Sequence, residues 1–265
     1  MFTKHLEGYD LGQIIDGLKS GGVQGADLCV RPGYPVNPEN AKTELPAAAK
    51  RFADEGLCIP LITTPGDFTD ASVDYAEGLF EACAEAGVKL VKLGYWQMED
   101  DGYWATLDRC RAKLEGFAKL AEKTGVKPVV HNHSGATMGL NSSAVMNLME
   151  GMDPGLVGVF TDVGHLSIVG EPYPMALDIV KDYISCVAFK DLYKKKNADG
   201  SWAIDMAPLG MGFGNFPQVM QLLKDMAFGG PISFHCEYHY MPPESVVDQL
   251  RIDTRFIQAI VDELE

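Results

Sequence analysis

The fold is decided by the stretch Val126-Lys127-Pro128-Val129-Val130-His131-Asn132-His133, in which a short apolar run ends in polar side chains. A long segment with apolar residues at helical spacing, Tyr103–Thr124, precedes it, and a second helical segment, Ser142–Glu150, follows it. A strand between two helices is the repeating unit of proteins with a parallel sheet. The same unit recurs in both directions along the chain, so the pattern predicts an α/β fold.

Strand-like apolar runs alternate with amphipathic segments along the whole chain. The expected strands are Phe2–Leu6, Ala26–Val30, Leu57–Thr63, Lys89–Leu93, Val126–Val130, Val157–Phe160, Ile184–Phe189 and Ile232–Phe234. The expected helices are the segment capped by Asp10 and ended by Gly21-Gly22, then Glu44–Glu55, Ala71–Ala86, Tyr103–Thr124, Ser142–Glu150, Tyr173–Lys181, Phe216–Met226 and Pro243–Leu264.

Eight such units in 265 residues predict a single (β/α)₈ TIM barrel that forms one domain over residues 1–265. A doubly wound sheet is the structural alternative. It would more often have about 5–6 strands and a Gly-rich turn after the first strand. Lys4-His5-Leu6 ends the first expected strand without such a turn.

The composition excludes several classes of partner. The net charge is −15, from 37 acidic and 22 basic residues, so a nucleic acid or an acidic membrane surface would be repelled. No apolar run approaches the ~18 residues of a membrane span, and the first residues hold no apolar signal core. The six cysteines form no C-x-x-C pair, which favours reduced thiols and a cytoplasmic location.

The longest irregular stretch, Leu192–Asn215, is rich in Lys, Gly and Asp, and we expect it to be an active-site loop. The apolar residues of Phe213–Phe216 are expected to be exposed and suggest a partner surface. The sequence leaves the oligomeric state open, with a homo-oligomer as one option.

Polar side chains follow the expected strands at the end where TIM barrels place their active sites. His131, Asp162 and Glu237 follow strands five, six and eight. One imidazole and two carboxylates can bind a divalent cation such as Mn²⁺, Co²⁺, Zn²⁺ or Mg²⁺. Other polar or aromatic residues at these ends, candidates for binding substrate or moving protons, are His5, Arg31, Trp96, His133, His165 and Lys190.

Each candidate also has a structural interpretation. A single His at a strand end is often only hydrogen-bonded in place, and His235 could be a core histidine of this kind. Asp191 could be no more than a helix N-cap, and Trp96 could belong to the core rather than stack on a sugar. Convergence of His131, Asp162 and Glu237 on one mouth of one barrel favours the functional interpretation.

Four short motifs in this order resemble the xylose isomerase-like barrel superfamily over nearly the whole chain. They are Asp162-Val163-Gly164-His165, Phe189-Lys190-Asp191, Pro208-Leu209-Gly210-Met211-Gly212 followed by Phe216, and Gly230–Glu237. The superfamily contains sugar isomerases and epimerases, inosose dehydratases and type IV apurinic endonucleases. The resemblance implies a metal bound by Asp162 and Glu237, with His165 as a substrate-binding residue.

Two positions depart from the pattern of the family. His131 replaces the metal-binding Glu of strand five, and Ala188 occupies the position of the strand-seven His. We therefore expect a weakened metal site. His133 or a water molecule could complete it, the ammonium group of Lys190 could stand where metal charge would be, or the site could be degenerate.

The leading hypothesis is a sugar isomerase or epimerase that moves a proton next to a carbonyl through an enediolate. Glu237 would be base and metal ligand, His131 and Asp162 further ligands, and His165 and Lys190 would bind substrate oxygens. The alternative is a metal-dependent keto-sugar or keto-inositol dehydratase with His131 or His133 as base. A metal-free, non-catalytic barrel is the third option. Nucleic-acid repair would need a basic groove, which the charge argues against.

Overall fold

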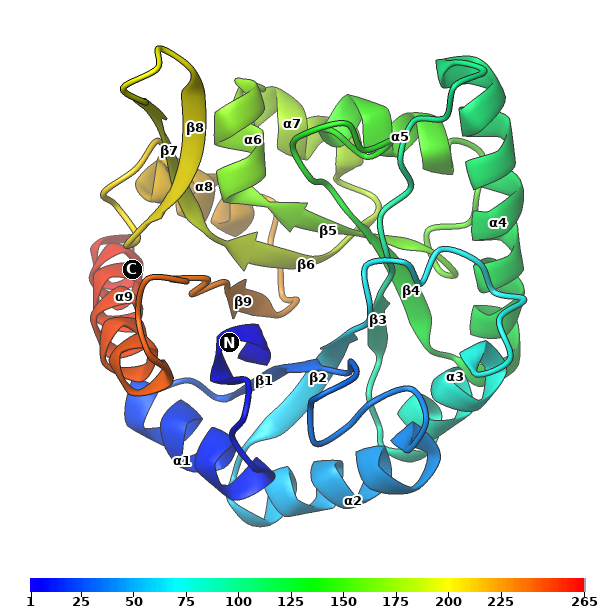
Figure 1. Ribbon diagram of the computed structural model, residues 1–265, viewed down its shortest axis with the longest axis horizontal. Coiled ribbons are helices and arrows are strands. Elements are labelled where there is room, and N and C mark those ends of the chain that lie inside the picture. Colours follow the sequence, from blue (N-terminus) through cyan, green and yellow to red (C-terminus); the bar gives the residue numbers. More distant parts are fainter. Residues whose placement is uncertain (265) are drawn as a thin grey trace.

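Parallel strands form a curved central sheet that helices surround in the computed structural model, which describes residues 1–264 (Figure 1). The 7-stranded sheet has the order β1-β2-β3-β4-β5-β6-β9. Its strands are β1 (Gly25–Cys29), β2 (Cys58–Thr63), β3 (Leu90–Lys92), β4 (Lys127–His131), β5 (Gly158–Asp162), β6 (Ile184–Phe189) and β9 (Ile232–Phe234). The predicted TIM barrel is confirmed.

The first two residues close the barrel between β9 and β1. The amide of Phe2 donates to the carbonyl of Phe234 at 3.0 Å, and the amide of Asp27 donates to the carbonyl of Met1 at 2.8 Å. The expected strand Phe2–Leu6 is wrong beyond Phe2, because Thr3–Leu6 forms a 3₁₀ helix (η1). The hydroxyl of Thr3, instead of a backbone carbonyl, accepts from the amide of Cys29.

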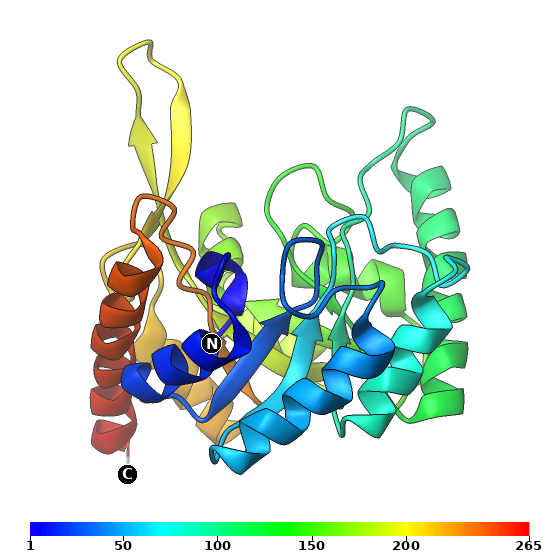
Figure 2. The ribbon, with the colours of Figure 1, turned by 60° about the horizontal axis from the view of Figure 1, so that its bottom comes forward.

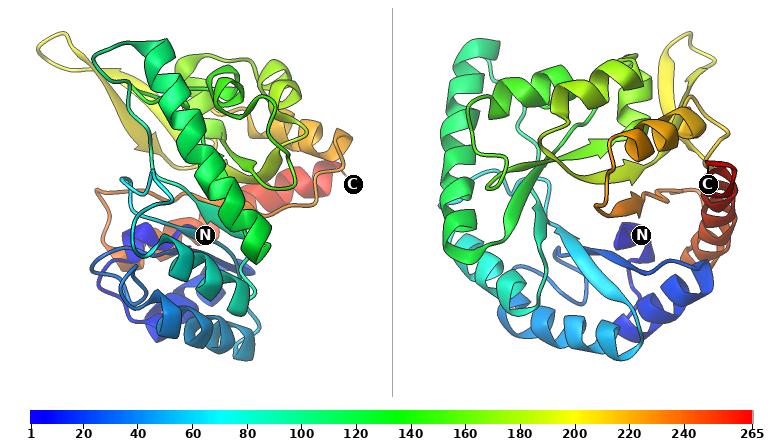
Figure 3. Two further views of the ribbon diagram at one scale, coloured as in Figure 1. Left: turned by 90° about the vertical axis from the view of Figure 1, so that its right-hand side faces the viewer. Right: turned by 180° about the vertical axis from the view of Figure 1, so that it is seen from behind.

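The helices cover the outer surface of the sheet (Figure 3). They are α1 (Leu11–Gly21), α2 (Ala41–Asp54), α3 (Ala76–Glu85), α4 (Tyr103–Thr124), α5 (Ser142–Met149), α6 (Val163–Val169), α7 (Tyr173–Val180), α8 (Phe216–Asp225) and α9 (Pro243–Leu264). Asp10 caps α1 in a capping box with Gln13, an interaction worth about 1 kcal/mol, and Gly22 ends the helix in the left-handed conformation.

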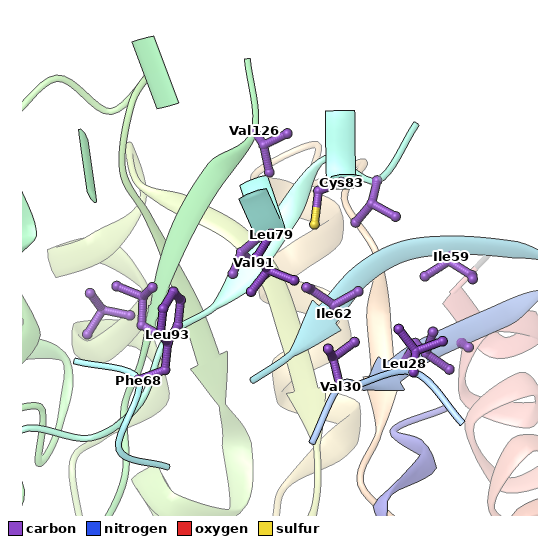
Figure 4. Close-up of a cluster of buried hydrophobic side chains, with 14 of the residues drawn as sticks. Leu28, Val30, Ile59, Ile62, Phe68, Leu79, Cys83, Val91, Leu93 and Val126 are labelled. Atoms are coloured by element: carbon purple, nitrogen blue, oxygen red, sulfur yellow. The ribbon is translucent and has the colours of Figure 1, made fainter. Parts of the chain in front are cut away.

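Two apolar layers hold the barrel together. Outside, Ile62 and Val91 of the strands pack against Leu79 and Cys83 of α3, as Figure 4 shows. Inside, a separate cluster fills the barrel below the polar residues; it consists of Leu61, Leu90, Val129, Phe160, Cys186 and Ala188. Because successive side chains of a strand point to opposite faces, the inward residues recur at every second position.

Besides η1, the structure contains a two-stranded hairpin and a short helix that were not expected. The segment expected to be irregular contains a hairpin, β7 (Asp191–Lys196) and β8 (Trp202–Ala207), which projects on the side where the strands end (Figure 2). Helix α6 follows β5 directly, and its seven residues are too few to give a helical period. Among the helices of residues 1–264, none has the length and apolar content that crossing a membrane requires.

The Phe213–Phe216 segment is only partly exposed, contrary to expectation. Phe213 is exposed, but Phe216 is fully buried at the start of α8, where it packs against Phe189. The apolar character of Phe216 therefore belongs to the core and gives no evidence for a partner surface.

Candidate metal centre and substrate pocket

Three side chains meet inside the barrel at the carboxyl ends of the strands, next to the inner apolar cluster. His131 ends β4, Asp162 ends β5, and His235 follows β9. One ligand atom from each of the three lies within 4.8 Å of the others, and all three residues are buried. Imidazole and carboxylate ligands in this number suit a divalent transition metal.

The surrounding hydrogen bonds hold His131 and Asp162 in fixed orientations. His131 Nδ1 lies 2.9 Å from the hydroxyl of Tyr95, and its Nε2 lies 3.1 Å from Asp162 Oδ2. Asp162 Oδ1 accepts from the amide of His165 and thereby caps α6. An outer partner that orients a ligating imidazole, as Tyr95 would here, is typical of protein metal sites.

His235 lacks the hydrogen bonds of a structural core histidine. Both ring nitrogens are buried, and neither has a hydrogen-bond partner within residues 1–264. Nδ1 lies 3.7 Å from Asp162 Oδ2, and Nε2 lies 3.4 Å from Asp27 Oδ2. Burial lowers the pKa of His235, but the Asp27 and Glu237 carboxylates outweigh it and raise that pKa. An unpartnered imidazole facing a carboxylate and a second imidazole fits a metal ligand.

Glu237, which sequence analysis placed among the ligands, is not part of this three-residue group. Its Oε1 accepts from the ammonium of Lys190 at 2.6 Å, and its Oε2 accepts from that of Lys4 at 2.6 Å. Burial raises the pKa of Glu237, but Lys190 and the other neighbouring cations hold it well below its usual range. A carboxylate held in this way is a weak proton acceptor.

Lys190 lies on the Ala188 side of the candidate metal cluster, the group of His131, Asp162 and His235. Asp162 and Ala188 are paired in register across β5 and β6, so a methyl group lies beside Asp162 where the family resemblance places a ligating His. Lys190 Nζ lies 3.9 Å from Asp162 Oδ2 and 3.3 Å from His165 Nε2. Although burial opposes it, Glu237 and Asp162 raise the pKa of Lys190, which therefore stays charged.

Hydrogen bonds fix the tautomers of the two remaining histidines at the mouth. His133 Nδ1 lies 2.8 Å from the carbonyl of Ser134, which only accepts, so Nδ1 carries the proton and Nε2 keeps a lone pair. His165 Nε2 faces the Lys190 ammonium, so its Nδ1 donates to the hydroxyl of Ser134. Burial lowers the pKa of both imidazoles, which favours their neutral forms.

A small polar cavity opens beside the cluster. Its lining includes Lys4, Arg31, Thr63, Lys92, Tyr95, His131, His133, His235 and Glu237. A second cavity, lined by Met1, Gly25 and Pro231 among others, lies at the opposite end of the strands, away from these polar residues.

The other candidate residues lie in different surroundings. Arg31 lines the cavity, with its Nε donating to the carbonyl of Thr64. Trp96 is buried in the outer core and donates to the carbonyl of Thr69, so it does not line the cavity. His5 is half-buried, and burial lowers its pKa to about 4. Asp191 accepts from the amides of Leu192, Gly210, Gly212 and Gly214 and so organises the loop before α8.

Sequence reasoning missed the roles of several residues in this site. Asp27 lies beneath His235 and accepts from the hydroxyls of Thr63 and Ser233. Lys4 binds Glu237 from a segment expected to be a strand. The period of two along β9 puts Ser233 and His235 on one inward face, and this signal favours His235 as strongly as Glu237.

Comparisons with known proteins agree with this architecture. The family model described as "Xylose isomerase-like TIM barrel" matches residues 15–258. An inosose dehydratase of Clostridium perfringens (strain 13 / Type A) is 28% identical over 197 residues, which span 69% of this chain and 64% of the dehydratase.

Two solved structures share the fold. The 3-keto-D-glucoside 4-epimerase YcjR from E. coli aligns with a TM-score of 0.74 at 14% identity, over 96% of this chain and 98% of YcjR. The IOLI protein with a bound zinc atom aligns with a TM-score of 0.77 at 16% identity, over 97% of this chain and 96% of IOLI. Together with the family match over most of its length, these findings show that this chain belongs to the xylose isomerase-like TIM barrel family.

Proposed function

We propose that this protein is an enzyme that moves a proton next to the carbonyl of a small sugar, as an isomerase or epimerase does through an enediolate. The observation that supports this most strongly is the cluster of His131, Asp162 and His235 beside the free lone pair of His133. A Lewis acid and a base on one cavity are the two elements that such a reaction needs.

In this proposal His131, Asp162 and His235 hold the divalent cation, with Mn²⁺, Co²⁺, Zn²⁺ and Mg²⁺ as candidates. A bound cation would polarise the substrate carbonyl and stabilise the negative oxygen of the enediolate. Ala188 supplies no fourth ligand, which supports weak binding. The IOLI structure, which contains zinc, supports the presence of a metal in this fold but does not identify the metal here.

The protein's own residues would divide the remaining work. His133 Nε2 removes the proton next to the carbonyl, while the Ser134 carbonyl holds the proton on Nδ1. Lys190 and His165 bind substrate oxygens from the side of Asp162. Glu237, which sequence analysis proposed as base and ligand, instead orients Lys190 and Lys4 in this scheme.

A dehydratase acting on a keto-sugar or keto-inositol is the second candidate, and the similarity to inosose dehydratases favours it. The two reactions share the enolate and differ in its fate. In a dehydratase, the enolate would expel a neighbouring hydroxyl as water, with the ammonium of Lys190 giving the proton to the leaving oxygen.

The experiment is incubation in D₂O with Mn²⁺ and, separately, D-fructose, D-tagatose and a keto-inositol, followed by NMR and mass spectrometry. Deuterium gain with a change of stereochemistry or carbonyl position supports isomerisation. Loss of one water supports dehydration. If the metal-loaded protein and the His133→Asn variant behave alike on every substrate, the proposed base is wrong.

The same proposal extends to the substrate class and the cellular compartment. Small carbohydrates suit the polar cavity, and a nucleic acid does not suit a chain with a net charge of −15. All six cysteines are free, and five of them are buried, which supports a reducing, cytoplasm-like compartment. One domain over the whole chain and a homo-oligomeric state stay predictions.

A further inference from the structure

Lys92 lines the polar cavity described above, but the proposed reaction gives its ammonium group no role. The side chain is 1% exposed, and within the described chain its Nζ has no hydrogen-bond partner. Its backbone is fixed, because its carbonyl accepts from the hydroxyl of Thr64 at 2.6 Å. Buried polar groups in native proteins nearly always have partners, so an unpartnered ammonium needs an explanation.

The surroundings of Lys92 show where that partner would be. Nζ lies 3.6 Å from the centroid of the Tyr95 ring, which covers one side of the ammonium with a favourable cation–π contact. Lys92 also lines the polar cavity, although its Nζ has almost no accessible surface, so a ligand that enters this cavity would approach the ammonium group. Burial and the neighbouring Arg31 lower the pKa of Lys92 well below its usual value, a shift that a bound anion would oppose.

A second cation stands at the same cavity. Arg31 anchors its Nε on the carbonyl of Thr64 and lies over the ring of Phe2, with the guanidinium carbon 5.5 Å from the ring centroid. The cavity lining contains three basic residues, Lys4, Arg31 and Lys92, and one acidic residue, Glu237. This local excess of basic side chains contrasts with a chain of 37 acidic and 22 basic residues.

We propose that Lys92 and Arg31 form an oxyanion-binding subsite, so that the substrate is a keto-sugar carrying a carboxylate or a phosphate group. The subsite lies on the β1–β3 side of the cavity, and the proposed metal cluster lies on β4, β5 and β9. A substrate could therefore place its anionic group at one side and its carbonyl at the other. This inference rests on the proposed function, because it concerns the substrate of the same site.

Calorimetric binding to the Mn²⁺-loaded protein tests the subsite without requiring turnover. The three matched ligands are D-fructose, 2-keto-D-gluconate and D-fructose 6-phosphate. We expect at least one of the two anions to bind at least tenfold more tightly than D-fructose. A preference for the phosphate ester alone identifies a phosphate, and a preference for the keto-acid alone identifies a carboxylate. Equal binding of all three, or no binding of any, overturns the proposal.

Variants locate the preference. Lys92→Met should bring the affinities for the anions and for D-fructose within about twofold, whereas Lys194→Met, on the exposed hairpin, should leave the preference intact. Lys92→Met is expected to fold, since it removes an unpaired buried cation. Arg31→Gln, at a partly exposed position, gives a second variant and should weaken the preference at least threefold. An anion preference that survives both substitutions contradicts the proposal, whether or not the enzyme turns over any of these sugars.

Discussion

At the scale of single residues, the site depends on which side chain from the β9 end completes the metal cluster. His235 is buried and unpartnered beside Asp162, whereas both oxygens of Glu237 are held by lysines. We expect His235→Ala to weaken metal binding by more than about 100-fold and Glu237→Gln by roughly tenfold, since losing a ligand costs more than losing an outer partner. Metal titration followed by elemental analysis measures both affinities.

The comparison of these two variants separates the two ligand assignments. If Glu237→Gln empties the site while His235→Ala keeps its metal, then the set expected from sequence, His131, Asp162 and Glu237, is correct. The exposed His239 offers a matched control, because His239→Ala removes an imidazole whose side chain is 62% exposed and should not change the metal content.

In the proposed mechanism, His133 acts as the base. Its Nε2 lone pair is fixed by the bond from Nδ1 to Ser134, and general-base catalysis contributes roughly 10²–10⁴-fold. We expect His133→Asn to lower kcat by about that factor and to slow deuterium exchange next to the carbonyl equally, with metal content unchanged. The matched control is His239→Asn, and an unaltered exchange rate in His133→Asn would remove His133 from the mechanism.

At the scale of elements, the sequence predicts those whose pattern is local and long enough to repeat. The bounds of α4, α9, β6 and β9 agree with those expected, because caps, breakers and apolar periodicity agree there. Helix α6 could not be predicted from seven residues. The β7–β8 hairpin was obscured by its run of lysines, although Asp199-Gly200 is a turn signal between two alternating segments.

The candidate site shows the same limit. Period-two alternation places His131, Asp162, His235 and Glu237 on inward faces, and the family resemblance brings them to one mouth. Neither the alternation nor the resemblance determines whether His235 or Glu237 lies beside His131 and Asp162, because that depends on the path of the chain after β9. In the structure Lys4 and Lys190 pair with Glu237, and Lys4 comes from a segment that forms a 3₁₀ helix instead of the expected strand.

Asp253 connects the closing helix α9 to two loops at the mouth of the barrel. Its titration should therefore change the free energy of unfolding with pH. It accepts from the hydroxyl of Tyr238 at 2.5 Å and from the amide of Leu209 at 3.3 Å. Burial raises its pKa above the usual value despite these bonds. A carboxyl group whose pKa is higher in the folded state favours folding at low pH, and this contribution is lost as the pH rises through the raised pKa.

We therefore expect Asp253→Asn to gain stability relative to the unsubstituted protein as the pH rises from about 4, the usual pKa of Asp, towards neutrality. Urea unfolding at several pH values between about 4.5 and 7.5 gives the free energy of unfolding of each protein. Asp248→Asn, at an exposed position of the same helix, is the control for replacing a carboxylate of α9 by an amide. A difference for Asp253→Asn that stays constant with pH would mean that the pKa of Asp253 is not raised.

At the scale of the whole molecule, one residue, Phe2, connects barrel closure with the candidate metal cluster. Phe2 bridges β9 and β1 through its backbone, and its buried ring lies 4.9 Å from the ring of His235, measured between centroids. The barrel thus has seven strands in its ladder and a two-residue segment in place of an eighth. Because closure depends on so short a segment, the packing of Phe2 should matter more than that of an ordinary core residue.

We expect Phe2→Ala to lower the free energy of unfolding by about 3–5 kcal/mol, because it leaves a cavity where β9 meets β1. It should also weaken metal binding, since His235 loses the aromatic ring against which it packs. Phe2→Leu, which refills most of that volume, should cost roughly 1 kcal/mol and keep the metal affinity. Urea unfolding without metal measures the first effect, and metal titration of the folded variants measures the second. If Phe2→Ala is as stable as the unsubstituted protein, the other strands close the barrel without this segment. If Phe2→Ala is destabilised but keeps its full metal affinity, barrel closure and the metal cluster are independent.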